Sequence, residues 1–203
     1  IEQTWNGTVG MGSRVTATIS RNGDLVHKMY LQCAAGFFAN DTATANYGSA
    51  FINNVELEIG GQMIDKHYGH WMETWTELTE PALISLPQTI AGGEANNLYG
   101  GVFSKMTGMG GVLGAGAANT TPIFIPLQFW FCRNPGLALP LIALQYHEVK
   151  VILNIQNGTT VGGPKLAGTD MHLWCDYIYL DTDERRRFAQ VSHEYLIEQV
   201  QVN

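Results

Sequence analysis

Alternation of apolar and polar residues with a period of two limits what this chain can fold into more than any other feature of its sequence. The alternation runs over Val15–Ile19, Val55–Ile59 and Val149–Ile155. Because successive side chains of a strand point to opposite faces of a sheet, this period predicts strands that each bury one face in a core. The dipeptides Asn22-Gly23 and Gly60-Gly61 follow two of these stretches and predict tight turns. The chain is therefore expected to be mainly β.

A different pattern occupies Pro122–Phe131, where almost every residue is apolar. A strand with two apolar faces is typical of a position deep in a sandwich or beneath another domain. The preceding segment Gly92–Asn119 is rich in glycine, alanine and asparagine and shows little periodicity. Long loops of this kind usually carry function or are disordered, so we expect a variable surface or contact loop.

Two short helices are predicted between the strands. Trp71, Trp75 and Leu78 recur at helical spacing, which predicts an amphipathic helix. Asp181 and Glu184 stand at the spacing of a capping box, which predicts the start of a second, connecting helix.

Short strands, long loops and connecting helices together favour an eight-stranded antiparallel jelly-roll sandwich over an up-and-down barrel. The pattern does not separate a jelly roll from an immunoglobulin-like sandwich. A chain of 203 residues is expected to form a single domain, residues 1–203, because domains commonly contain roughly 100–200 residues.

Composition limits the partners that the chain can have. The formal net charge is −7, and the one run of basic residues is Arg185–Arg187. Because neutralising phosphates requires clustered lysine and arginine, direct binding of nucleic acid is not expected. Charged residues make up 14% of the chain, a low fraction that indicates a surface partly covered by other subunits. The apolar stretches fall short of the ~20 residues of a membrane span.

The three cysteines bear on the compartment. Cys33, Cys132 and Cys175 are far apart and have apolar or aromatic neighbours. Their odd number and surroundings indicate buried free thiols in a reducing compartment, with one disulfide and a leftover thiol as the alternative.

We expect no catalytic, metal-binding or cofactor-binding site. The glycines of Gly108–Gly114 fit neither a dinucleotide-binding pattern nor a P-loop. His67 and His70 lack a third ligand nearby and are interpreted as a surface pair. Tyr146–Glu148 stands where a strand begins and is interpreted as a structural polar group.

Sequons of the Asn-x-Ser/Thr type occur at Asn6, Asn40, Asn119 and Asn157. The last three lie in predicted loops and are candidate glycosylation sites. Free thiols argue against passage through the secretory pathway, so occupancy is a minor expectation.

Four segments, considered together, resemble the major capsid protein of nucleocytoplasmic large DNA viruses, the group that includes chloroviruses and iridoviruses, and the resemblance is strongest to the chlorovirus-like branch. The segments are ISRNGDL at 19–25, VELEIGGQ at 55–62 with IDKHY at 64–68, PGLALPLIALQYHEV at 135–149, and LD at 180–181 through RFAQ at 187–190 to HEYLIEQ at 193–199. They extend over nearly the whole chain.

The resemblance implies the first of two tandem jelly rolls in a structural protein that is not an enzyme. It further implies a homotrimer that forms a pseudo-hexagonal capsomer, contacts neighbouring capsomers and minor capsid proteins, and tiles an icosahedral shell. The implied location is the virion capsid, assembled in the host cytoplasm over an internal membrane that the protein does not span. The family's N-terminal arm and second jelly roll are not in this sequence, so we expect it to be part of a longer product.

Within this scheme we expect three groups of interface or junction residues. Trp71 and Trp75 are predicted core or interface anchors. An apolar run is predicted to close one end of the sandwich or to pack on the second jelly roll. Its members are Pro135, Leu137, Leu139 and Pro140. Arg185 and Arg187 are predicted to pair with carboxylates or carbonyls at the junction or on a neighbouring subunit, with plain solvent exposure as the alternative.

Two other functions remain open at this point. A carbohydrate-binding jelly roll would line a groove with exposed tryptophan, tyrosine and acidic side chains. A jelly-roll enzyme would require a bound metal or a clustered acid–base pair.

Overall fold

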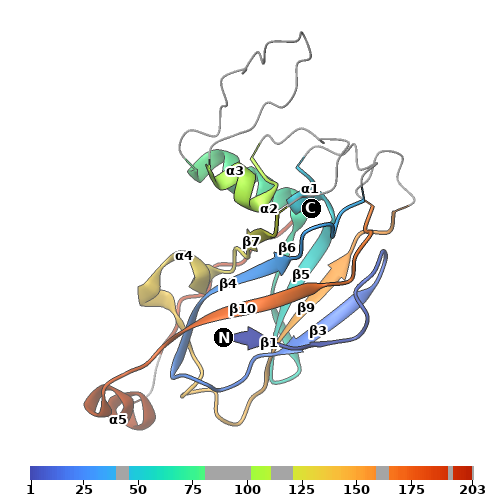
Figure 1. Cartoon of the computed structure of the whole chain (residues 1–203). Coiled ribbons are helices and arrows are strands. Elements are labelled where there is room, and N and C mark those ends of the chain that lie inside the picture. The colour runs from blue at the N-terminus through green and yellow to red at the C-terminus, as the bar shows by residue number, and fades with distance from the viewer. Residues whose placement is uncertain (40–45, 81–101, 111–120, 159–164, 192–193, 203) are drawn as a thin grey trace.

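The computed structural model describes residues 1–39, 46–80, 102–110, 121–158, 165–191 and 194–202. Two antiparallel sheets form a sandwich, with short helices beside them (Figure 1). The described strands are β1 (Glu2–Gln3), β2 (Trp5–Asn6), β3 (Arg14–Thr18), β4 (Leu25–Cys33), β5 (Ile52–Ile59), β6 (Gln62–Tyr68), β7 (Ile123–Pro126), β8 (Leu139–Pro140), β9 (Val149–Ile155) and β10 (Met171–Ile178). The described helices are α1 (Tyr47–Ala50), α2 (Gly69–Thr79), α3 (Val102–Thr107), α4 (Trp130–Arg133) and α5 (Thr182–Gln190), with a 3-10 turn at Pro135–Leu137.

The strand order is that of a jelly roll. One sheet has the order β1-β10-β4-β7, with β8 also pairing with β4, and the other has the order β2-β3-β9-β5-β6. Without β2 and β8, which are two-residue extensions, the ten strands reduce to eight. Counted along the chain, these eight stand in the order 1-8-3-6 in one sheet and 2-7-4-5 in the other. This order identifies two interlocked Greek keys, so the eight-stranded antiparallel jelly roll predicted from the sequence is confirmed.

Antiparallel pairing divides the connections between two ends of the sandwich. One end, which we call the hairpin end, carries the connections β3–β4, β5–β6 and β7–β9 and the segment after β10. The connections β4–β5, β6–β7 and β9–β10 leave at the other, which we call the helical end because it carries α1, α2 and α3 (Figure 1). Helix α5 lies beyond the hairpin end.

Two predicted turns have different outcomes. Gly60 and Gly61 have φ angles of 60° and 84° and join Ile59 to Gln62 in a two-residue hairpin, the turn that such positive angles allow. The predicted tight turn at Asn22-Gly23 is wrong, because these residues lie in the crossover from β3 in one sheet to β4 in the other.

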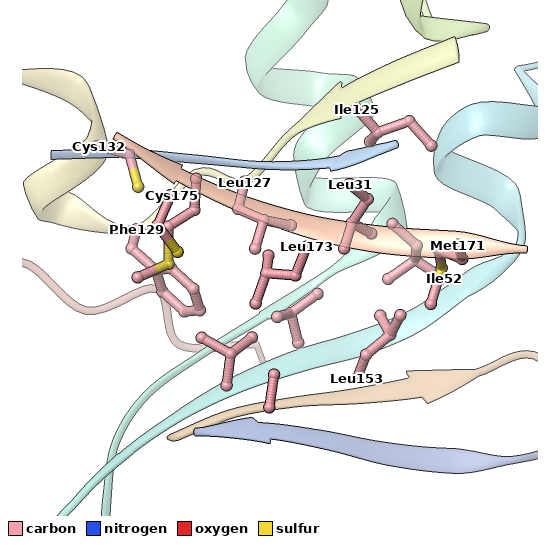
Figure 2. Close-up of a cluster of buried hydrophobic side chains, with 14 of the residues drawn as sticks. Leu31, Ile52, Ile125, Leu127, Phe129, Cys132, Leu153, Met171, Leu173 and Cys175 are labelled. Atoms are coloured by element: carbon pink, nitrogen blue, oxygen red, sulfur yellow. The ribbon is translucent and has the colours of Figure 1, made fainter. Parts of the chain in front are cut away.

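The space between the sheets contains a core of apolar side chains (Figure 2). Leu31 and Leu173 from one sheet and Val55 and Leu153 from the other have no exposed surface. Removing such a side chain from water stabilises the fold by roughly 1.5–3 kcal/mol. The residues that alternate in the sequence are therefore those that the sandwich buries. Cys33, Cys132 and Cys175 lie in this core as free cysteines, as the sequence predicts.

The apolar segment Pro122–Phe131 is only partly a strand, which corrects the prediction. Strand β7 ends at Pro126, and Trp130–Arg133 form the short helix α4. Ile125, Phe129 and Phe131 are nevertheless completely buried. The pattern indicated burial correctly, but a buried strand and a buried turn of helix look alike when every residue is apolar.

Helix α2 exists where the spacing of Trp71, Trp75 and Leu78 predicts it, but it buries another face. Met72 and Thr76 are buried, whereas Leu78 is 75% exposed. Both tryptophans are half-buried. The helix therefore presents its tryptophans at the margin of the core.

Candidate assembly surfaces

Helix α2 is placed by a glycine at its first residue. A Cβ on Gly69 would lie 2.2 Å from the carbonyl oxygen of Ser49 and 2.4 Å from that of Ile52. Any larger residue would collide with this backbone, so the absence of a side chain lets α2 start directly after β6 and pack against the segment before β5. This contact fixes the direction in which the tryptophans of α2 project.

Trp71, Trp75 and Arg133 form a surface that we call the tryptophan flank. The two indole rings lie 5.8 Å apart between centroids, and Cζ of Arg133 lies 4.4 Å from the Trp75 ring centroid. Arg133 Nη2 donates a hydrogen bond to the carbonyl oxygen of Gln128 at 3.2 Å, and Nη1 lies 3.2 Å from Glu198 Oε2. Stacking and hydrogen bonding together hold the guanidinium in one place, as arginine does at protein interfaces.

A buried polar pair lies on β6 near Arg133. Burial raises the pKa of Asp65 to about 6, against the lowering effects of the Lys66 backbone N–H and of the Arg133 charge. Burial, together with the smaller effect of the Arg133 charge, lowers the pKa of His67 to about 3. The His67 ring packs edge-on against Phe129, 4.6 Å between centroids.

This pair does not form a reaction site. Asp65 is 5% exposed and His67 is not exposed at all, so neither side chain can contact a dissolved substrate. The interpretation of His67 and His70 as a surface pair is wrong for His67, which is part of the core, and holds for His70, which is exposed.

The apolar run at the hairpin end is divided between core and surface. Leu139 and Pro140 are buried, and as β8 they pair with Val26 and Leu25 of β4. Pro135 is exposed and Leu137 is half-buried. The inner half of the run thus belongs to this sandwich, and the outer half remains available for contacts.

Helix α5 begins at the predicted residue, but its capping differs from the prediction. Asp181 is the N-cap and makes no side-chain cap hydrogen bond. Arg185 instead lies 2.8 Å from Asp24 Oδ2, which also accepts a hydrogen bond from the backbone N–H of Leu180 at 2.8 Å. Burial alone would raise the pKa of Asp24, but the Leu180 N–H and the Arg185 guanidinium hold it below its ordinary value.

The two arginines of α5 that the sequence singled out therefore have different contacts. Both are exposed, but Arg185 forms an ion pair with Asp24, the residue before β4 of the same domain. Figure 1 shows α5 and α2 at opposite ends of the molecule, so the predicted interface residues fall into separate surfaces.

The loop and glycosylation predictions are only partly within the described residues. Asn40 and Asn119 lie outside them, as does most of Gly92–Asn119. The described part of this loop contains helix α3, which the sequence did not predict. Asn157 is exposed just after β9, at the helical end.

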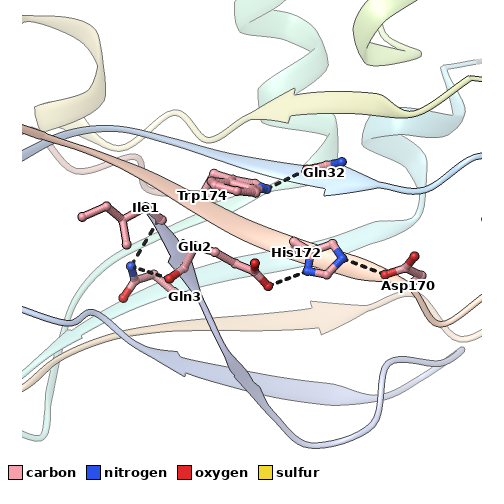
Figure 3. Close-up of polar contacts among 7 residues, drawn as sticks. All are labelled: Ile1, Glu2, Gln3, Gln32, Asp170, His172 and Trp174. Atoms are coloured by element: carbon pink, nitrogen blue, oxygen red, sulfur yellow. Dashed lines mark hydrogen bonds and ion pairs between the residues drawn. The ribbon is translucent and has the colours of Figure 1, made fainter.

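Sequence reasoning missed two groups of contacts. One is the segment 194–202 after α5, whose Glu198 reaches Arg133. The other is His172, whose Nδ1 lies 2.6 Å from Glu2 Oε1 and whose Nε2 lies 2.7 Å from Asp170 Oδ1 (Figure 3). Asp170 and His172 are two residues apart, a local signal that could have been used, but Glu2 and Glu198 are distant in sequence from their partners.

Among the residues that the structure describes, no group of three or more histidine, cysteine, aspartate or glutamate side chains is arranged to hold a metal ion. No helix in the described ranges has the length and apolarity needed to cross a bilayer.

Comparison with known proteins gives one consistent result. A family profile described as "Major capsid protein N-terminus" matches residues 1–181. The major capsid protein of Pyramimonas orientalis virus is 51% identical over 203 residues, covering 99% of this chain and 48% of the relative. That of Paramecium bursaria Chlorella virus 1 is 41% identical and covers 99% of this chain and 44% of the relative.

Solved structures agree with these relatives. A quasi-atomic structure of the PBCV-1 virus capsid matches with a TM-score of 0.71 at 38% identity, covering 99% of this chain and 46% of that one. The Faustovirus major capsid protein matches with a TM-score of 0.56 at 14% identity, which supports the fold alone. The chain spans about half the length of the relatives it matches.

Proposed function

The chain belongs to the major capsid protein family of nucleocytoplasmic large DNA viruses, and we propose that it forms the first jelly roll of the block from which such a virus builds its shell. The observation that carries the proposal is the 51% identity to one major capsid protein over 99% of the chain. The jelly-roll strand order supports the proposal independently, because it is read from the pairing of the strands and not from the identity.

The sandwich has the properties that a shell block requires. Its core holds the two sheets at a fixed distance, so loops and sheet edges keep constant positions from copy to copy. Such constancy allows one contact to be repeated around a symmetric shell. We propose a homotrimer with a pseudo-hexagonal outline, in which a second jelly roll follows this one in each polypeptide.

The partners proposed for the block are other proteins. The net charge of −7 argues against a basic face that binds the genome, so contacts would be with neighbouring capsomers and minor capsid proteins. The location that follows is the virion capsid, assembled in the host cytoplasm above an internal membrane. In this role the protein is structural and not an enzyme.

Individual residues receive roles in this proposal according to where they lie. Trp71 and Trp75 are half-buried at the tryptophan flank, and Pro135 and Leu137 are accessible at the hairpin end, so we propose contacts for both groups. Arg187 is exposed on α5 and is proposed to meet a carboxylate or carbonyl of another domain or subunit.

The native mass of the full-length gene product tests this proposal. Size exclusion with light scattering in dilute neutral buffer is expected to give a stable trimer of a chain about twice the length of this one. A soluble monomer with saturable glycan binding would refute it and would favour a carbohydrate-binding module.

A further inference from the structure

Strand β1 closes one edge of its sheet with little backbone pairing. It is the outermost strand in the order β1-β10-β4-β7, and it pairs with β10 through the two residues Glu2 and Gln3. Beside them, the backbone N–H of Cys175 donates to the carbonyl oxygen of Ile1 at 2.9 Å. Because so short a pairing is marginal by itself, side chains must supply much of the attachment of β1.

Two side chains of β1 attach it, one in the interior and one on the outer surface. Gln3 is buried, and its Oε1 accepts hydrogen bonds at 2.7 Å from both the backbone N–H and the hydroxyl of Ser20. Glu2 is exposed, and its Oε1 lies 2.6 Å from Nδ1 of His172 on β10 (Figure 3). The inner attachment uses uncharged groups, whereas the outer one depends on the charge of an imidazole.

His172 lies between two carboxylates, one on each side of its ring. Its Nε2 lies 2.7 Å from Asp170 Oδ1, while Nδ1 faces Glu2. When the imidazole is protonated, both nitrogens donate and both carboxylates are bound. When it is neutral, one nitrogen has no hydrogen and its lone pair faces a carboxylate oxygen. One of the two contacts is then repulsive, so the arrangement is complete only while the ring holds its proton.

The surroundings of His172 leave these two carboxylates as the groups that set its charge. The residue opposite it on β4 is the uncharged Gln32, and the other described residues that line the pocket beside the cluster are uncharged too. Asp176, the next acidic residue of β10, lies four residues further along the strand. The hydrogen bond to Glu2, with a smaller effect of Asp170, raises the pKa of His172 above its ordinary value. The change of charge therefore falls near or above neutral pH.

We propose that His172 is a proton-operated clasp for this edge of the sheet. The protonated ring binds Glu2 and Asp170 together and holds β1 on β10. Loss of the proton to solvent breaks the outer attachment, so β1 loosens. The edge of β10, including the backbone N–H of Cys175, then becomes able to pair with a strand of another chain. The clasp uses contacts within this domain and does not require the proposed function.

Hydrogen–deuterium exchange of the full-length gene product tests the clasp. Exchange into the peptide that contains Cys175 is measured at pH 6 and at pH 8.5 and is corrected for the intrinsic pH dependence of amide exchange. Because exposed ion pairs contribute modestly to stability, protection of this peptide is expected to fall by about three- to tenfold at the higher pH. Strand β9, in the middle of the other sheet, is expected to stay protected over the same exchange times.

Three variants complete the test. His172→Gln cannot take up a proton and is expected to show the faster exchange at both pH values. Glu2→Gln is expected to exchange faster than wild type at pH 6 and to lose most of the pH difference. His70→Gln is the matched control, because His70 is exposed on α2 and its ring lies against Tyr68; it is expected to keep the pH difference of the wild type.

Equal corrected exchange at the two pH values in the wild type would overturn the inference. The same pH difference in His172→Gln, unchanged exchange in Glu2→Gln, or a parallel loss of protection in β9 would also overturn it. The native mass of the protein is a separate measurement, so the clasp and the trimer are tested independently.

Discussion

Arg133 stacks its guanidinium on the indole ring of Trp75, with 4.4 Å between Cζ and the ring centroid. The pair joins α4, which follows β7, to α2, which follows β6. Since β6 and β7 are edge strands of different sheets, this contact helps to close the open side of the sandwich. The ion pair of Arg133 with Glu198 attaches the segment 194–202 at the same place.

Replacing Arg133 tests how much this junction contributes. Arg133→Ala is expected to lower the free energy of unfolding by about 1–2 kcal/mol, because it removes a cation–π contact, an ion pair and a hydrogen bond. Arg186→Ala is the control, since Arg186 is 70% exposed and forms a 3.7 Å pair with Asp183 on the same helix; a change below about 0.5 kcal/mol is expected there. Equal effects in urea unfolding would show that the flank adds nothing.

Gly69→Ala tests the contact that positions α2. The added Cβ would lie 2.2 Å from one carbonyl oxygen and 2.4 Å from another, so the helix must move away, with an expected loss of about 3 kcal/mol or more. Gly10→Ala is the matched control, because a Cβ there meets nothing within 4 Å. Thermal unfolding should show a large fall in Tm for Gly69→Ala and little change for Gly10→Ala; a normal Tm for Gly69→Ala would contradict the packing described.

The His172 cluster predicts a pH dependence near neutrality. The hydrogen bond to Glu2 and the neighbouring Asp170 raise the pKa of His172 above its ordinary value of 6.5. The folded state therefore holds this proton more tightly than the unfolded state, and the stabilisation is complete below pH 6.5 and is lost as pH rises through the folded pKa. Urea unfolding between pH 6 and 8.5 is expected to show this loss in the wild type and not in His172→Gln; parallel curves would refute the prediction.

Burial of Asp65 and of His67 is expected to make acid act on the free energy of unfolding in opposite directions. The His67 pKa is about 3 in the folded protein against an ordinary 6.5, so the unfolded state binds the proton first and stability falls by about 2–3 kcal/mol between pH 6.5 and 4.5. The Asp65 pKa is about 6 against an ordinary 3.8, so the folded state binds that proton first and stability rises over part of the same range. The two effects largely offset each other in the wild type.

Single variants should separate these two contributions. Relative to wild type, Asp65→Asn is expected to lose stability more steeply on acidification from pH 6.5 to 4.5, because the stabilisation that comes from protonating Asp65 in the folded state is absent. His67→Leu is expected to lose less stability or to gain some. Chemical unfolding at each pH measures both slopes, and slopes of the same sign relative to wild type would show that one of these groups is not buried as described.

Local sequence patterns predicted some elements of the candidate surfaces and not others. The spacing of Trp71 and Trp75 predicted α2, but it did not predict that Met72 and Thr76 would be the buried face, because both faces contain apolar residues. The ion pairs of Arg133 with Glu198 and of His172 with Glu2 join positions far apart in sequence. No periodicity connects such positions, so these contacts could not be predicted.

The sequence by itself determined which residues enter the core, because a strand with alternating apolar residues can satisfy the hydrophobic effect with one face only. It also determined the Gly60-Gly61 hairpin, because that turn requires two positive φ angles. The tertiary structure alone decided the contacts between distant parts of the chain. The segment 194–202 binds to β6, Arg185 pairs with Asp24, and His67 is buried. Each of these contacts requires a long loop to close, which costs conformational entropy, and many other pairings would cost a similar amount. Only the complete packing of both sheets selects the native pairing.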